Sequence, residues 1–145
     1  MKIVVDTNRI IAALISKGAS REIFFSHLLY LVAPDMALEE LESKKLVLTG
    51  KAGISPEEID DAIAFAKSRL KLVPRQSFVP FLSDMPSEVG DKHDLPFLAC
   101  CLAIGAEGIW THDKDFLRQK RVRVFTNKDL LDYLGKMAEK KGKDG

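Results

Sequence analysis

The chain has 145 residues, of which 46% are hydrophobic and 30% are charged. This length and composition fit one globular domain with its own core and leave little room for a second domain. The formal net charge of +1 excludes a protein that attracts nucleic acid through a strong overall positive field. Binding to RNA would therefore have to come from a local basic patch or from bound metal ions.

The sequence predicts a cytoplasmic protein. The apolar run after Met1 is too short for a signal peptide, and no segment approaches the roughly 20 apolar residues of a membrane helix. The two cysteines, Cys100 and Cys101, are adjacent in an apolar stretch, where a disulfide between them would be strained. They also lack the spacing of zinc ligands, so we expect two reduced core residues and no zinc site.

In the first half of the chain, apolar β-branched runs alternate with segments of helical periodicity. Buried parallel strands have such continuous apolar runs, whereas amphipathic helices repeat their apolar residues every three to four positions. The predicted elements, in chain order, are a strand over residues 2–5, helices over 8–15 and 21–29, a strand over 30–33 and a helix over 36–48. Residues 49–53 are expected to form a loop.

The second half continues the alternation. Ser55 and Pro56 are typical of a helix start, and residues 95–104 are apolar nearly all round, which predicts a central, buried helix ended by Gly105. The predicted elements are a helix from 56 to about 70, a strand over 72–73, mostly loop over 74–90, a helix over 95–104, strands over 108–111 and 122–125, and a last helix over 127–134.

Strands that alternate with helices predict an α/β fold with a central, mainly parallel five-stranded sheet. We expect one domain over residues 1–134, followed by a basic, flexible tail over residues 135–145.

Four acidic residues stand next to the predicted strands or on the helices that connect them. Asp6 directly follows the first strand and Asp113 follows the fourth, whereas Asp94 begins the buried helix and Glu40 lies in the helix after the second strand. In open α/β sheets, ligands bind at the carboxyl ends of the strands. We therefore expect these four carboxylates to face one cleft.

Carboxylates that are packed together repel one another unless a cation lies between them. Mg²⁺ and Mn²⁺ prefer oxygen ligands, and either ion would turn such a cleft into a phosphate site. A bound ion lowers the pKa of a water ligand and stabilises charge on phosphorus oxygens. Thr7 and Thr111 have hydroxyls that can orient carboxylates or water beside the ion.

Each acid also has a simpler interpretation. Asp6 could belong to an ordinary turn, Asp94 could be a plain helix N-cap, and Glu40 could lie on a solvated helix surface. Asp113 has a neighbouring acid, Asp115, in what could be an ordinary loop. The placement of all four at one predicted sheet edge favours the site.

At this point the motifs resemble those of a known family, the PIN domains. The four segments that carry the resemblance are Val4-Val5-Asp6-Thr7-Asn8, Leu38-Glu39-Glu40-Leu41, Asp91-Lys92-His93-Asp94-Leu95 and Gly108-Ile109-Trp110-Thr111-His112-Asp113. The resemblance extends from residue 1 to about residue 134. It implies a three-layer α/β/α fold and an endoribonuclease that depends on Mg²⁺ or Mn²⁺.

The resemblance also implies roles for the acids. Asp6, Asp94 and Asp113 would hold the metal, and Glu40 would bind or orient metal-bound water. The supporting or additional site residues would be Thr7, Asn8, Thr111 and Asp115. Many small members are toxins of toxin–antitoxin pairs and form homodimers, so an antitoxin protein and a second copy are expected partners.

Two positions have alternatives. The second acid is Glu39 or Glu40, and Leu41 after it favours Glu40. The third is Asp91 or Asp94, and its position directly before the helix favours Asp94.

A basic cluster follows the fourth motif and consists of Arg118, Lys120, Arg121 and Arg123. It is a candidate RNA-binding surface, because such side chains contact phosphates. The alternative is a solvated edge of the fifth strand. His112 is expected to point away from Thr111 and Asp113.

Two other functions share features of this pattern. Haloacid-dehalogenase-type phosphatases require a second carboxylate two residues after the first, where this chain has Asn8. The main alternative is a PIN-like module that binds RNA or protein without cleavage.

Overall fold

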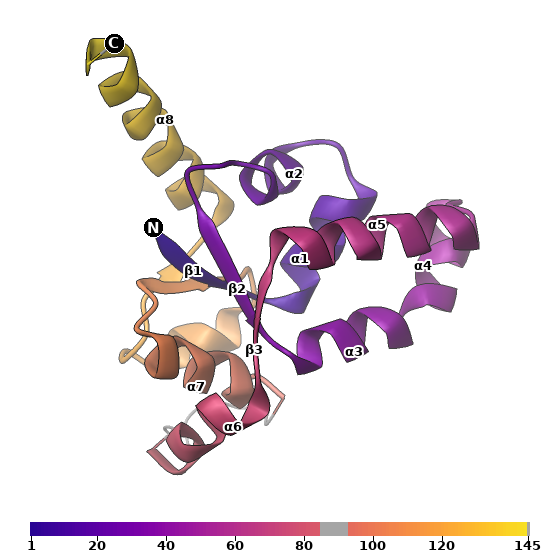
Figure 1. The fold of residues 1–145 in the computed structure, drawn as a ribbon, viewed down its shortest axis with the longest axis horizontal. Helices are drawn as coiled ribbons and strands as arrows, with labels where there is room; N and C mark the ends of the chain where they lie inside the picture. Colours follow the sequence, from indigo (N-terminus) through magenta and orange to yellow (C-terminus); the bar gives the residue numbers. More distant parts are fainter. Residues whose placement is uncertain (85–92, 145) are drawn as a thin grey trace.

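The computed structural model describes residues 1–84 and 93–144 of the chain. At its centre lies an all-parallel sheet of five strands in the order β3-β2-β1-β4-β5 (Figure 1). The strands are β1 (Lys2–Val5), β2 (Tyr30–Pro34), β3 (Lys71–Val73), β4 (Gly108–Trp110) and β5 (Val124–Phe125). The strand order reverses between β1 and β4, which is the usual ligand position in such sheets.

Helices cover both faces of the sheet and complete a three-layer α/β/α fold. Helix α7 packs against β1, β2 and β4, with α6 and η1 beside it, whereas α1, α2, α3 and α5 pack together on the opposite face (Figure 1). The helices are α1 (Thr7–Ile15), α2 (Ala19–Phe24), α3 (Met36–Ser43), α4 (Lys45–Ala52), α5 (Pro56–Arg69), α6 (Arg75–Phe78), η1 (Val79–Asp84), α7 (Leu95–Ile104), η2 (Lys114–Arg118) and α8 (Asn127–Asp144).

The predicted start and stop signals act as expected in two helices. The Ser55 hydroxyl accepts the Glu58 N–H at 3.1 Å and caps α5, and Pro56 is its first residue. Gly105 adopts φ 63° after α7, a conformation that glycine reaches without the steric cost of a side chain. Residues Phe97–Cys101 of α7 are buried, so this helix is the central one that its apolar sequence predicted.

The prediction of one helix over residues 36–48 and a loop over 49–53 was wrong. The helix breaks at Lys44, and α4 then continues to Ala52. The Thr49 hydroxyl donates to the Leu46 carbonyl at 2.9 Å, so the polar side chain of Thr49 finds its partner within the helix. The helical stop is Gly53, at φ 63°.

Two further boundaries differ from the prediction. Residues 75–84 were expected to be loop but form α6 and η1, while residues 85–90 of that predicted loop lie outside the described residues. The last helix was expected to end at residue 134 but runs to Asp144, because residues 136–141 are good helix formers without a proline.

Cys100 and Cys101 are free and buried, as predicted. Burial raises the pKa of the Cys100 thiol to about 12 and that of Cys101 further, so neither thiol ionises at neutral pH. Among the described residues, no helix is long and apolar enough to cross a membrane.

Candidate active site

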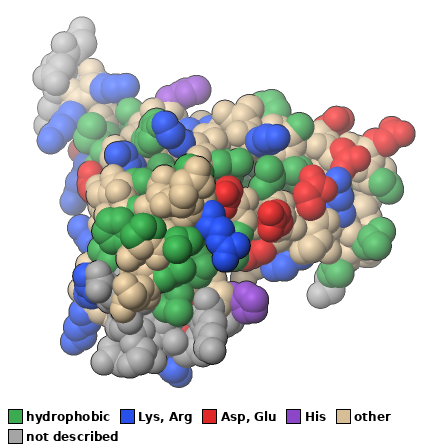
Figure 2. Space-filling model, turned by 60° about the horizontal axis from the view of Figure 1, so that its bottom comes forward, with side chains coloured by type: hydrophobic (Ala, Val, Ile, Leu, Met, Phe, Trp, Pro, Cys, Tyr) green, Lys and Arg blue, Asp and Glu red, His purple; other side chains and the backbone are tan. Residues whose placement is uncertain are grey.

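A polar cleft of about 290 Å³ lies where β1 and β4 end. Its walls come from the start of α1, from the α3–α4 junction, from the start of α7 and from the segment after β4. All four predicted acids line this cleft, together with five other residues: Asp6, Thr7, Asn8, Glu40, Lys44, His93, Asp94, Phe97 and Asp113. The surface in Figure 2 shows acidic side chains grouped across one face of the molecule, with basic side chains beside them.

Asp6 is the most deeply placed of the acids, with 8% of its surface exposed. Its backbone N–H donates to the Trp110 carbonyl at 3.0 Å, which continues the β1–β4 pairing by one residue. Its Oδ2 accepts a hydrogen bond of 2.7 Å from the Thr111 hydroxyl. The sheet and this hydroxyl together fix the carboxylate at the floor of the cleft.

Thr111 connects two of the acids. Its hydroxyl donates to Asp6 and also accepts the backbone N–H of Asp113 at 3.0 Å. The Asp113 carboxylate in turn accepts the backbone N–H of Asp115 at 2.9 Å and caps η2. One buried hydroxyl thus sets the position of Asp6 relative to Asp113.

The pKa of Asp6 is raised above its ordinary value. Burial is the main cause, because it disfavours the charged form, and the nearby Asp113 carboxylate adds to it. The Thr111 hydroxyl, the Asn8 backbone N–H and the Arg9 guanidinium act in the opposite direction. A cation bound beside Asp6 would therefore stabilise its charged form against burial and against the Asp113 charge.

Three acids converge closely enough to share one cation. One carboxylate oxygen from each of Asp94, Asp113 and Asp115 lies within 4.8 Å of the other two. The predicted metal set was Asp6, Asp94 and Asp113. The structure keeps Asp94 and Asp113 together, adds Asp115 to them, and places Asp6 on the floor of the same cleft.

Of the alternative site acids that the sequence offered, Glu40 and Asp94 line the cleft. Asp94 makes no side-chain capping hydrogen bond to α7, so it is not a plain N-cap. Glu40 lines the cleft, whereas Glu39 is exposed and does not. Asp91 lies outside the described residues.

The sequence profile of the PIN domain family matches residues 4–133. The chain belongs to the PIN domain family. No curated protein matches it. Membership implies a nuclease-type fold, and the four motifs that resembled the family all contribute to the cleft of this PIN domain.

The donor set of this PIN domain fits a divalent cation. Its carboxylate oxygens are the ligands that Mg²⁺ and Mn²⁺ prefer. The Thr7 hydroxyl is 2% exposed, lines the cleft and has no hydrogen-bond partner among the described residues. A buried polar atom without a partner costs free energy, and a water held by the cation would supply that partner.

Lys44 is a residue of the cleft that the sequence reading missed. Its ammonium group donates to the Asn8 side chain at 3.3 Å and so spans the cleft between α1 and the α3–α4 junction. The sequence held a signal for it, because Lys44 stands four residues after Glu40, and residues four apart share a helix face. It adds a positive charge opposite the acids.

The basic cluster is divided by the fold. Arg118 lies beside the acids, with its guanidinium 3.8 Å from the Asp115 carboxylate. Arg123 precedes β5 at the opposite, amino edge of the sheet and stacks on the Phe125 ring at 4.4 Å. Lys120 is exposed. Arg118 thus stands beside the acids, whereas Arg123 lies at the other edge of the sheet.

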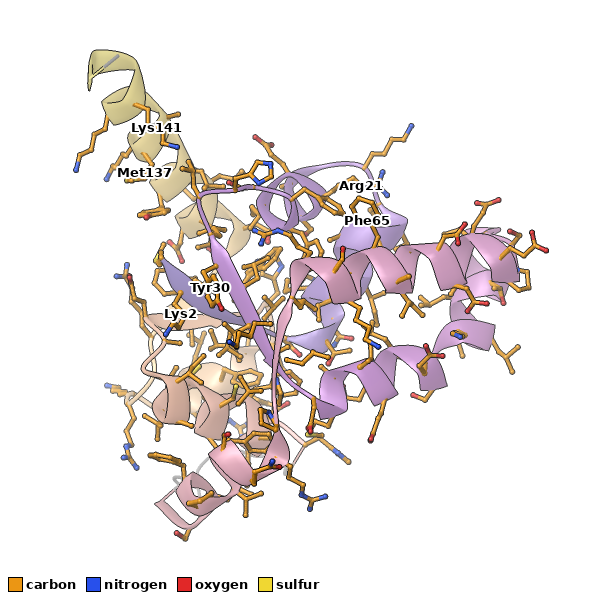
Figure 3. All side chains as sticks on the ribbon, viewed as in Figure 1. Lys2, Arg21, Tyr30, Phe65, Met137 and Lys141 are labelled. Carbon is orange, nitrogen blue, oxygen red and sulfur yellow. The ribbon has the colours of Figure 1, made fainter. Side chains whose placement is uncertain are left out.

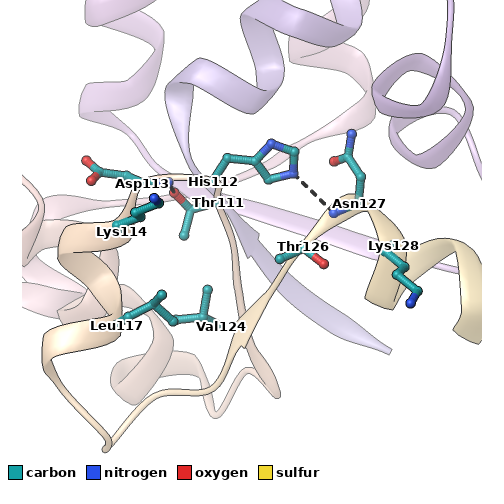
Figure 4. A pocket seen from close by; sticks show the side chains of 9 residues that line it. All are labelled: Thr111, His112, Asp113, Lys114, Leu117, Val124, Thr126, Asn127 and Lys128. Carbon is teal, nitrogen blue, oxygen red and sulfur yellow. Dashed lines mark hydrogen bonds between the residues drawn. The ribbon is translucent and has the colours of Figure 1, made fainter.

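His112 points away from Asp113, as predicted. Its Nε2 accepts the backbone N–H of Asn127 at 3.2 Å, at the start of α8 (Figure 4). Burial and the charge of Arg9 lower the pKa of His112, so the neutral imidazole that can accept this bond is favoured at neutral pH.

Proposed function

We propose that this PIN domain is a Mg²⁺- or Mn²⁺-dependent endoribonuclease that hydrolyses phosphodiester bonds of RNA. The observation that carries the proposal is the convergence of Asp6, Glu40, Asp94 and Asp113, from four separate segments, on one cleft at the strand-order reversal. Such carboxylates repel one another without a cation, and a cation in this position attracts phosphate.

In this proposal, the role of each cleft residue follows from its position. Asp94 and Asp113, with Asp6 below them, hold the cation, and Asp115 is an additional ligand. Thr111 fixes Asp6, and Glu40 orients a water molecule on the opposite wall. When bound, the cation supplies a water of lowered pKa and neutralises charge on the phosphoryl oxygens.

Lys44 binds the RNA phosphate in this proposal. It is a cation in the lining of the same cleft, and the hydrogen bond that its ammonium group makes within the described residues is the 3.3 Å bond to Asn8. A phosphate is a stronger acceptor than this side-chain amide, so the ammonium group can exchange one for the other.

A protein partner, either a second copy or an antitoxin, is the second part of the proposal. One large apolar side chain of α5, Phe65, is 62% exposed. Phe65 lies near Arg21 in Figure 3, and the two residues line one hollow together with Leu14 and Phe25. The apolar side chains that border this hollow are typical of a protein contact. Phe24 and Leu29, in and after α2, are core residues and do not contribute to this surface.

The nuclease is tested with single-stranded and structured RNAs in Mn²⁺, Mg²⁺ or EDTA. The purified protein is compared with Asp6→Asn, and Asp61→Asn, an exposed aspartate of α5 outside the cleft, serves as the matched control. We expect cleavage that requires the metal, disappears in Asp6→Asn and persists in Asp61→Asn. Equal cleavage by all three proteins would point to a contaminant and refute the proposal.

The non-catalytic alternative is separated by metal binding. A true metal site stabilises the folded state by mass action, by about 2.7 kcal/mol at a free Mn²⁺ concentration of 100 times Kd. A binding module without a site shows no Mn²⁺-dependent rise in Tm and no cleavage.

A further inference from the structure

A second cavity, of about 400 Å³, lies directly beside the acidic cleft (Figure 4). It is bounded by the segment after β4, by η2 and by the β5–α8 junction. Its lining residues are Thr111, His112, Asp113, Lys114, Leu117, Val124, Thr126, Asn127 and Lys128. Asp113 lines both cavities, so the two are neighbours across one side chain.

The floor of this cavity is aliphatic. Leu117 and Val124 lie side by side there, and Leu117 is 61% exposed although it is a large apolar residue (Figure 4). Exposed aliphatic carbon at the base of a cavity is unfavourable in water, and an apolar ring placed on it would be stabilised.

The rim carries positive charge. Lys114 and Lys128 stand on two sides of the cavity and are both exposed (Figure 4). A ligand that suits this arrangement has a flat apolar part for the floor and an anionic part for the lysines. A nucleotide has both, and the cavity volume lies in the range of roughly 300–1,000 Å³ of small-ligand pockets.

Two polar side chains of the wall, Asn127 and Thr126, already have hydrogen-bond partners. The Asn127 amide accepts from the Trp110 indole at 2.8 Å and donates to the Ser20 hydroxyl at 3.0 Å. Thr126 is bound through both its N–H and its hydroxyl to the Asp129 carboxylate. These groups hold the wall in place but are not available to read the edge of a base.

We propose that this cavity holds the base and sugar of one RNA nucleotide next to the phosphate that lies in the acidic cleft. The inference rests on the proposed ribonuclease function and adds a substrate subsite to it. Since the floor is aliphatic and the Asn127 and Thr126 side chains are engaged elsewhere, the subsite requires a base without a strong preference for one base. A flexible, unpaired strand satisfies this geometry, because its base can turn out of a stack.

The test is a methyl NMR titration of the full chain in EDTA, so that neither metal nor cleavage is needed. The probes are adenosine 5′-monophosphate, uridine 5′-monophosphate and, as a ligand without a base, ribose 5-phosphate. We expect the Leu117 and Val124 methyl signals to shift with both nucleotides. Ribose 5-phosphate should bind several-fold more weakly and should leave these methyls nearly unshifted.

Matched variants identify the floor. Leu117→Gln removes exposed aliphatic surface at the cavity without a charge change, and Leu46→Gln makes the same change on α4 outside it. We expect the apparent Kd for both nucleotides to rise roughly fivefold in Leu117→Gln, as befits the loss of apolar contact with a base. It should be unchanged in Leu46→Gln.

Three outcomes overturn the subsite: methyl shifts absent at Leu117 and Val124, equal binding of ribose 5-phosphate, or equal effects of the two variants. Because the titration is free of metal, its result does not depend on cleavage. Nucleotide binding at Leu117 without ribonuclease activity would support the subsite and refute the proposed nuclease function. Ribonuclease activity without nucleotide binding at Leu117 would support the nuclease function and refute the subsite.

Discussion

Replacement of Thr111 by valine should destabilise the fold more than is usual for the loss of a single hydroxyl group. Thr111 is 1% exposed, and valine keeps its shape but lacks the hydroxyl. The substitution therefore removes the bond to the Asp6 carboxylate at 2.7 Å and the bond from the Asp113 N–H at 3.0 Å. It leaves a buried carboxylate oxygen without its donor.

The expected loss follows from the two bonds. A hydrogen bond to a charged group contributes about 1.5–3 kcal/mol, and a neutral one about 0.5–1.5 kcal/mol. Asp113 is exposed, so water can replace part of the second bond. We expect the free energy of unfolding to fall by about 2–4 kcal/mol in Thr111→Val.

Urea denaturation in EDTA measures this loss, and Thr7→Val is its matched control. Thr7 is 2% exposed and lines the same cleft, but its hydroxyl has no partner among the described residues. Its removal should change the free energy of unfolding by less than about 0.5 kcal/mol, or stabilise the protein. With m near 2 kcal/mol/M, Thr111→Val should lower the midpoint by about 1–2 M at unchanged m.

Equal midpoints for the two variants would refute the reasoning. That result would mean that the Thr111 hydroxyl contributes no more than an unpartnered one. A normal midpoint for Thr111→Val together with a lost Mn²⁺ response would show instead that the hydroxyl only orients the acids.

The remaining predictions concern charge. Asp6→Asn should raise the metal-free unfolding free energy at neutral pH and abolish the Mn²⁺-dependent rise in Tm, as seen by calorimetry with and without Mn²⁺; a full Mn²⁺ response in the variant would remove Asp6 from the site. Because the pKa of Asp6 is raised, its contribution to stability is present below its ordinary value of 3.8 and is lost as pH rises through the folded value. The stability of the metal-free wild type relative to Asp6→Asn should therefore decline with rising pH over that range, and a constant difference would contradict the pKa shift. The affinity for Mn²⁺ should fall as pH falls through the same range, because protons compete for the carboxylate; isothermal titration at several pH values checks this, and a pH-independent Kd would count against it. Neutralisation of Arg118 and Arg121 together should weaken RNA binding and reduce the slope of log K against log salt by about 0.7 per lost phosphate contact, and an unchanged slope would exclude the basic cluster as an RNA surface.

The sequence predicted the sheet and the positions of the acids well, for a physical reason. Buried parallel strands are short apolar runs, and Asp6 and Thr111 stand directly at the ends of two of them. A residue that directly follows such a run lies at the carboxyl edge of the sheet, independently of the conformation of the loops. The placement of the cleft therefore depended only on local patterns and on the rule for parallel sheets.

Features that depend on distances between segments were not predictable. Asp115 joins Asp94 and Asp113 because η2 turns directly after Asp113, and no periodic pattern marks such a short 3-10 turn. The break at Lys44 divides two segments that both have helical composition, so propensity alone did not show it. The same break brings the Lys44 ammonium group into the cleft.

The bond between Thr111 and Asp6 joins residues that lie 105 positions apart in the chain. Asp6 is synthesised before β4 and Thr111, which follow it on the ribosome by more than one hundred residues. Until then, β1 can pair with β2 but has no neighbour on its other side, and the acids of the cleft are not assembled. The order of synthesis thus delays completion of the cleft until β4 has been made, so a growing chain that ends before β4 carries Asp6 and Glu40 without a formed site.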